Sequence, residues 1–106
     1  MAVTEFKNKA EYDSAITANK IVIVDASAVW CGPCKAIAPV YKKLSEDEKF
    51  KDILFAKFDV DEVADLAKHL GVTAMPTFFA IKDGEKVDLL QGANLAALTK
   101  LIEKTL

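Results

Sequence analysis

A run of β-branched residues constrains the fold of this chain more than any other feature. The segment from Ile21 to Val24 has four of them in a row, with no polar residue between. A strand with one face in water alternates apolar and polar side chains, whereas a strand inside a parallel sheet is apolar on both faces. Residues 20–26 are therefore predicted to form a strand that is buried on both sides.

Helix caps, apolar periodicity and turn residues predict the other elements. Asn8 followed by Glu11 indicates a capping box, and Asp83-Gly84 between two apolar runs indicates a hairpin. In chain order we expect a short strand at residues 3–6, a helix through about Ala18, the strand at 20–26, a helix from about Cys34 to Lys49 kinked at Pro39, and a strand from Ile53 to Asp59. There follow a helix from Glu62 to Leu70 capped by Asp61 and ended by Gly71, strands from Thr77 to Lys82 and from Glu85 to Gln91, and a last helix capped by Asn94 with Leu95, Leu98, Leu101 and Ile102 on one face. This order predicts an α/β three-layer sandwich, in which helices cover both faces of a mixed five-stranded sheet.

Length and composition exclude several classes of protein. A chain of 106 residues, 52% of them apolar, fits one globular domain over residues 1–106. All 14 basic residues are lysine, and the absence of arginine argues against nucleic-acid binding. We find no signal peptide, and the longest mostly apolar stretch, residues 21–30, is too short to span a bilayer. We therefore expect a soluble intracellular protein that binds neither nucleic acid nor membrane.

The cysteine count also limits the possible sites. Cys31, Cys34 and the single histidine, His69, are too few for a disulfide-stapled scaffold or a closed zinc site. Lys35 stands where a haem-attachment motif needs histidine. We expect no metal site and place His69 on the surface. An inert cysteine pair, or half of a metal site, stays open as an alternative.

The segment from Trp30 to Lys35 carries the most specific chemistry. It lies between the buried strand and the helix that follows, where functional loops of α/β sheets collect. Two cysteines at this spacing can form and open a short disulfide. Cys31 is expected at the helix N-terminus, which favours a thiolate and makes it the nucleophile, with Cys34 as the resolving thiol. Gly32 would permit a tight turn, and Pro33 suits a first helical position.

With these residues in place, the sequence resembles the thioredoxin family over essentially the whole chain. The resemblance is carried by the Trp30–Lys35 motif WCGPCK together with five further features: Val24-Asp25, Pro39, the segment 56–61, Met75-Pro76-Thr77, and Gly84 with Gly92-Ala93. It implies the thioredoxin fold with four helices and a general protein disulfide reductase. One departure is clear. Ala26 and Ser27 stand where the family commonly carries an aromatic pair, so ring volume should be missing beneath the active-site loop.

The resemblance also implies roles for residues outside the motif. Asp25, a carboxylate in an apolar strand whose pKa burial should raise, would move a proton on or off Cys34. Lys57, a lone charge in a strand that reads as buried, would modulate Asp25. Pro76, if cis, would present the Met75 backbone to an extended substrate. The substrate-binding surface would consist of Trp30, Ala74, Met75, Pro76, Gly92 and Ala93. Ordinary structural roles for Asp25, Lys57 and Pro76 are the alternatives.

Partners follow from the same resemblance. Thioredoxin reductase would recharge the dithiol with electrons from NADPH, so no cofactor would be bound to this chain. Peroxiredoxins, ribonucleotide reductase and methionine sulfoxide reductases would be clients of a cytoplasmic monomer. Two other functions stay open: an oxidant or isomerase of an oxidising compartment, and a non-enzymatic binding subunit that uses the surface around Trp30 and Pro76.

Overall fold

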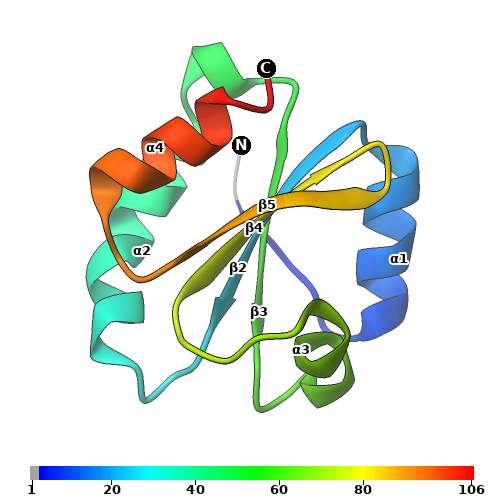
Figure 1. Cartoon of the computed structure of the whole chain (residues 1–106), viewed down its shortest axis with the longest axis vertical. Coiled ribbons are helices and arrows are strands. Elements are labelled where there is room, and N and C mark those ends of the chain that lie inside the picture. The colour runs from blue at the N-terminus through cyan, green and yellow to red at the C-terminus, as the bar shows by residue number, and fades with distance from the viewer. Residues whose placement is uncertain (1–2) are drawn as a thin grey trace.

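The computed structural model describes residues 3–106, and its centre is one five-stranded sheet (Figure 1). The strands are β1 (Thr4–Glu5), β2 (Ile21–Ser27), β3 (Leu54–Asp59), β4 (Thr77–Lys82) and β5 (Glu85–Gln91), arranged in the order β1-β3-β2-β4-β5. The helices are α1 (Lys9–Ala18), α2 (Gly32–Ser45), α3 (Ala64–Leu70) and α4 (Leu95–Glu103), with a short 3₁₀ helix, η1, at Glu48–Phe50. β3 is parallel to β1 and β2, whereas β4 is antiparallel to β2 and β5. The predicted mixed α/β sandwich is confirmed.

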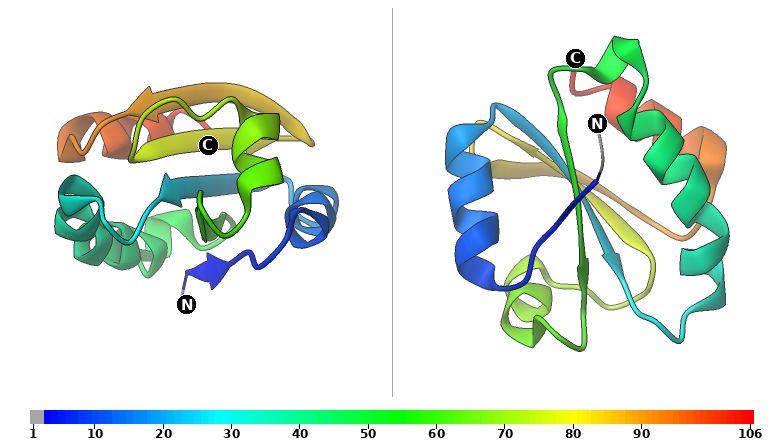
Figure 2. Two further views of the ribbon diagram at one scale, coloured as in Figure 1. Left: turned by 90° about the horizontal axis from the view of Figure 1, so that it is seen from below. Right: turned by 180° about the vertical axis from the view of Figure 1, so that it is seen from behind.

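The central strand β2 separates two apolar cores. Val22 and Val24 face the core that α1 and α3 cover, and Ile21 and Ile23 face the core under α2 and α4. Figure 2 shows these two helix pairs on opposite sides of the sheet. All residues from Ile21 to Ala26 are buried, which confirms the prediction made from the β-branched run.

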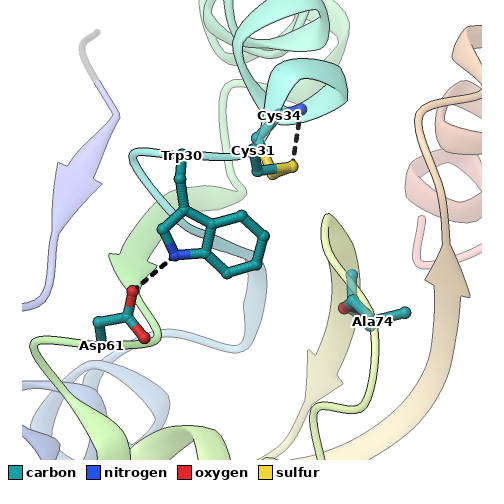
Figure 3. The surroundings of a disulfide bond; sticks show 6 residues. Trp30, Cys31, Cys34, Asp61 and Ala74 are labelled. Carbon is teal, nitrogen blue, oxygen red and sulfur yellow. Dashed lines mark hydrogen bonds between the residues drawn. A yellow bond between two sulfur atoms is a disulfide. The ribbon is translucent and has the colours of Figure 1, made fainter.

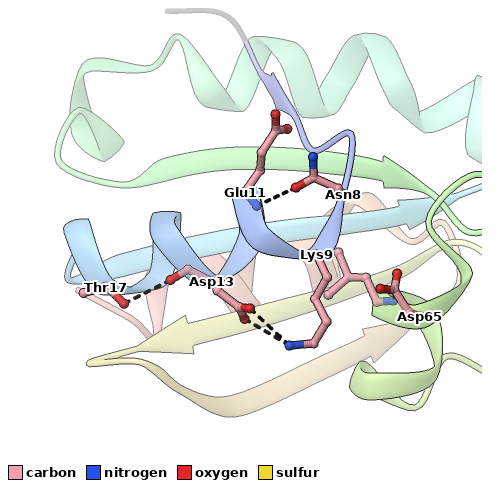
Figure 4. A network of polar contacts seen from close by, with 7 residues as sticks. Asn8, Lys9, Glu11, Asp13, Thr17 and Asp65 are labelled. Carbon is pink, nitrogen blue, oxygen red and sulfur yellow. Dashed lines mark hydrogen bonds and ion pairs between the residues drawn. The ribbon is translucent and has the colours of Figure 1, made fainter.

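Helix caps formed largely as predicted (Figure 4). The Asn8 side chain accepts the Glu11 N–H at 2.9 Å, and Asn94 caps α4 in the same way. Glu11 does not complete the capping box at Asn8, because its carboxylate accepts the Lys7 N–H at 2.7 Å. Gly71 ends α3 with φ of 75°, a left-handed conformation that favours glycine.

Two predicted helix boundaries are wrong. α2 continues past Pro39 but ends at Ser45, short of Lys49. The Asp47 side chain then accepts the Lys49 N–H and begins η1, so a local cap interrupts the helical pattern. α3 begins at Ala64, and Asp61 is not its cap. The kink predicted at Pro39 stays a prediction.

No helix within residues 3–106 is both long enough and apolar enough to cross a membrane.

Candidate redox site

The two cysteines meet at the start of α2, where they form a disulfide (Figure 3). Their Cα atoms lie 5.3 Å apart. Cys31 is the N-cap of α2, and its Sγ accepts the Cys34 N–H at 3.2 Å. Each cysteine is only 5% exposed, packed with Ala28 and Met75. The disulfide predicted from the spacing is therefore present, at a helix N-terminus.

Other residues of the motif differ in what they do. α2 begins at Gly32, so Pro33 is its second residue, one position later than predicted. Gly32 does not have a positive φ, and a Cβ there would meet nothing within 4 Å. The backbone at this position therefore does not require glycine, whereas the tight turn itself stays a prediction. Gly32 and Pro33 are both exposed, so they leave the rim of the disulfide open.

Trp30 is held over the site by a residue that sequence reasoning assigned elsewhere. Trp30 is 64% exposed, and its Nε1 donates a hydrogen bond to Asp61 Oδ2 at 2.8 Å (Figure 3). In the loop before α3, Asp59 Oδ1 accepts the N–H groups of Asp61 and Glu62, and α3 itself has no side-chain cap. No local signal could identify Asp61 as a site residue, because its partner is 31 residues away in the sequence.

The loop before β4 forms the opposite side of the site. The Met75–Pro76 peptide bond is cis, as predicted. Pro76 is buried, Met75 packs against the two cysteines, and Ala74 lies across from Trp30 in Figure 3. The Gly92 N–H donates to the Pro76 carbonyl at 2.8 Å, which brings the end of β5 to this loop. Ala93, the next residue, is exposed.

Asp25 lies deeper, behind the disulfide. Asp25 is 4% exposed, and its Oδ1 has no hydrogen-bond partner within residues 3–106. Burial raises the pKa of this carboxyl to about 7, although the positive charge of Lys57 opposes the rise. Asp25, Cys34 and Lys57 line the same small cavity. A group that exchanges a proton near neutral pH therefore lies beside the second cysteine.

Lys57 is the ladder neighbour of Asp25 on β3, but its side chain is exposed. The strand pattern predicted that the Lys57 side chain is buried, and this prediction is wrong. Strand β3 is buried on most of its length, yet at this position the side chain borders a groove with Pro39 and Ala38 of α2 rather than a filled core. The lysine can thus act on Asp25 through its charge while its ammonium group stays in water.

The alanine next to Asp25 has an aromatic neighbour on the adjacent strand. Ala26 is fully buried, and its ladder partner on β3 is Phe58, which is 1% exposed in the same core. An aromatic side chain thus packs beside the alanine. Phe58 is therefore a ring in the same core, beside the position that the alanine leaves small.

Neither His69 nor a carboxylate cluster joins the cysteines. His69 is exposed on α3, as predicted, with its ring 6.0 Å from that of Tyr12. Within the described part of the chain, no three His, Cys, Asp or Glu side chains are grouped so as to hold a metal ion.

Comparison with known proteins identifies the family. The family model named Thioredoxin matches residues 3–104. The chain belongs to the thioredoxin family. Thioredoxin of Coprinus comatus is 43% identical over 104 residues, 98% of each chain, and thioredoxin-1 of Saccharomyces cerevisiae is 49% identical over 100 residues, 94% of this chain and 95% of the yeast protein. Thioredoxins are disulfide oxidoreductases, and this thioredoxin-family chain, with its Cys31–Cys34 disulfide, is a protein disulfide oxidoreductase.

Solved structures agree with this assignment. Plasmodium falciparum thioredoxin superimposes with a TM-score of 0.93 at 47% identity, covering 98% of this chain and all of that one. A chain from a structural study of the thiol resolving mechanism in yeast mitochondrial 1-Cys peroxiredoxin via glutathione/thioredoxin systems gives a TM-score of 0.90 at 41% identity, covering 96% and 94%. The thioredoxin fold predicted for this thioredoxin-family chain is confirmed.

Proposed function

We propose that this oxidoreductase works as a general protein disulfide reductase. The Cys31 thiolate attacks a sulfur of the target disulfide, forms a mixed disulfide and releases the other target sulfur as a thiolate. The Cys34 thiolate then attacks the Cys31 sulfur, which closes the Cys31–Cys34 disulfide and releases the second target thiol. The target gains two electrons, and the dithiol loses two. The observation that carries the proposal is the disulfide at the N-terminus of α2.

The assignment of Cys31 as the nucleophile rests on its position. An N-cap thiolate lies at the positive end of the helix dipole and can accept unpaired backbone N–H groups. The Cys34 N–H already points to Cys31 Sγ at 3.2 Å in the oxidised form. Cys34 lies inside the first turn and offers its sulfur to the mixed disulfide from within the protein. These features favour attack by Cys31 and resolution by Cys34.

Asp25 is proposed to move the proton of Cys34. It lines the same cavity as Cys34, and its pKa of about 7 matches a group that must both take and return a proton near neutral pH. Lys57 lowers the pKa of Asp25 through its charge, which is the modulating role expected from the family. The proton therefore stays close to the sulfur that receives and releases it.

The substrate-binding surface is proposed to surround the disulfide. Its residues are Trp30, Ala74, Met75, Pro76, Gly92 and Ala93. Met75 takes part in none of the backbone hydrogen bonds of residues 3–106 outside the helices and strands. An extended segment that bears a disulfide could therefore pair with this backbone as an added strand does. The apolar side chains around it would contact the flanking residues.

The cellular context is also a proposal. Thioredoxin reductase would return the disulfide to the dithiol with electrons from NADPH, and this chain would bind no cofactor of its own. Peroxiredoxins are proposed clients, supported by the similarity to a chain from the yeast peroxiredoxin study. Ribonucleotide reductase and methionine sulfoxide reductases are proposed on family resemblance alone, as are a cytoplasmic location and a monomeric state.

An NADPH-coupled assay with thioredoxin reductase and a protein disulfide substrate tests the proposal. We expect turnover in the wild type, none in Cys31→Ser, and a stable mixed disulfide on Cys31 in Cys34→Ser. The two variants control for each other, because each removes one sulfur from the same site. Equal turnover in Cys31→Ser would refute the nucleophile assignment. A reduction potential near the value of about −180 mV found in disulfide isomerases would refute the reductase direction.

A further inference from the structure

A groove on the outer side of Asp25 has features that the reduction of disulfides does not use. It runs between α2 and the chain just before β1. Its lining residues are Val3, Asp25, Lys35, Ala38, Pro39, Tyr41, Lys42 and Lys57. The walls are apolar, the rim carries three lysines, and the floor carries one carboxyl group.

The three lysines have no acidic partner. Within residues 3–106, none of Lys35, Lys42 and Lys57 lies within 4.0 Å of a carboxylate oxygen. Lys35 and Lys42 are seven residues apart on α2, so they project from the same side of the helix. Lys57 approaches from β3. Positive charge therefore converges on the groove from two elements without being neutralised.

Asp25 lies in the lining of the groove and has no hydrogen bond there. Asp25 is 4% exposed, and its Oδ1 has no hydrogen-bond partner in the described part of the chain. Tyr41, which also lines the groove, does not supply one. Its hydroxyl is used by the carbonyls of Ile23 and Ala56, at 2.9 and 2.7 Å. Because Oδ1 is sealed from solvent, the oxygen that a ligand in the groove can reach is Oδ2, which has no hydrogen bond within residues 3–106 and can donate one while the carboxyl group is protonated.

We propose that this groove binds a small aliphatic monocarboxylate. The ligand carboxylate accepts a hydrogen bond from protonated Asp25 and is neutralised by the rim of Lys35, Lys42 and Lys57, while its alkyl chain packs on Ala38 and Pro39. No covalent bond changes. The consequence rests on the proposed function: a bound carboxylate holds the Asp25 proton and slows any step in which Asp25 takes a proton from Cys34.

The chemistry of the groove favours a carboxylate over a phosphate. The chain has no arginine, so no planar fork is available to bind a phosphate through two parallel hydrogen bonds. One protonated carboxyl group can offer one hydrogen bond, which suits a single carboxylate oxygen. The apolar walls give an alkyl chain a surface to cover.

Binding must depend on pH, because Asp25 donates only while it is protonated. The charged and titratable groups around it are Lys57 from β3, Tyr41 and the two rim lysines from α2, Glu5 from β1 and Asp59 at the end of β3. Glu5 is paired with Lys7 at 3.2 Å, and Asp59 accepts two backbone N–H groups. From β4, the ladder neighbour is the apolar Phe78. With Asp25 titrating at about pH 7, the affinity should fall about tenfold for each pH unit above 7.

Titration of the oxidised protein with butanoate, followed by ¹H–¹⁵N NMR, tests the proposal without any turnover. We expect saturable shifts at Ala38, Lys42 and Lys57 at pH 6, and at least tenfold weaker binding at pH 8.5. Lys42→Gln should weaken binding about two- to fivefold, as expected for the loss of one exposed charge pair. Lys68→Gln on α3, across the sheet, should leave it unchanged and serves as the matched control.

A second variant keeps the test independent of the role of Asp25 in catalysis. In Asp25→Asn the amide still donates an N–H, so butanoate should bind with the same affinity at pH 6 and pH 8.5. Three results would each overturn the proposal. They are chemical shift changes with butan-1-ol as large as those with butanoate, inorganic phosphate that binds more tightly than butanoate, and binding of butanoate to the wild type that does not change with pH. If Asp25→Asn reduces disulfides at the wild-type rate while the wild type binds butanoate as predicted, the proton-transfer role fails and the binding site stands.

Discussion

The buried carboxyl group of Asp25 should make the stability of the protein depend strongly on pH. Asp25→Asn replaces it with a group of the same shape that cannot ionise. The structure leaves the carboxyl 4% exposed, without a hydrogen bond at Oδ1, and partly compensated by Lys57 alone. Ionising Asp25 in the folded state is therefore costly, whereas in the unfolded chain it is not.

The magnitude follows from the two pKa values. The folded value is about 7 and the ordinary value is 3.8. Each pKa unit is worth about 1.36 kcal/mol, so the full difference corresponds to roughly 4 kcal/mol. Because the folded pKa is raised, the free-energy cost of ionising Asp25 in the folded state is absent below about pH 4. This cost grows between pH 4 and 7 and is complete above pH 7. In that window the wild type loses stability relative to the variant.

Urea unfolding of the oxidised proteins at several pH values measures this difference. We expect the free energy of unfolding of Asp25→Asn minus that of the wild type to be flat below pH 4, to rise by about 4 kcal/mol up to pH 7, and to stay constant beyond it. Asp52→Asn, which changes an exposed carboxylate, should show no such rise. A difference that stays constant from pH 4 to 8 would refute the reasoning, because it would mean that Asp25 ionises as easily in the folded state as in the unfolded state.

Three further predictions on packing and backbone conformation can be tested by urea unfolding. Tyr41→Phe removes the donor of two backbone carbonyls and should cost about 1–3 kcal/mol; a cost near zero would show that the hydroxyl contributes nothing there. Ala26→Phe should destabilise by about 1–3 kcal/mol because Phe58 already occupies the adjacent space, and adding Phe58→Ala should recover part of that loss; additive costs would contradict this compensation. Gly71→Ala should cost about 1 kcal/mol or more because φ is 75°, whereas Gly32→Ala, at an open position without a positive φ, should change stability little; equal effects would refute the argument.

Most of the fold could be predicted because its signals are local. The β-branched run marked the buried central strand, Asn8 and Asn94 marked two helix starts, and Gly71 marked a helix end. Each of these features depends on residues within one turn or one strand. The boundary at Ser45 was missed because the end of α2 depends on a competing cap at Asp47.

The site residues that the sequence placed wrongly depend on distant partners. Asp61 reads locally as a helix cap, but it accepts the indole N–H of Trp30. Lys57 reads as buried from its strand, but its side chain borders an open groove beside α2. In both cases the role depends on a residue that is distant in the sequence and adjacent only in the folded protein: Trp30 for Asp61, and α2 for Lys57.

The sequence by itself determined the reacting groups: two cysteines with a glycine and a proline between them, at a position where a strand passes into a helix. The reason is that a helix N-terminus and its dipole are built from consecutive residues. The tertiary structure alone decided how far the pKa of Asp25 is raised, what fills the space beside Ala26, and which charges surround the groove. The apolar strand around Asp25 already indicated that its pKa is raised, but the extent of the rise, the packing and the surrounding charges depend on burial and on electrostatic interactions between segments far apart in the chain.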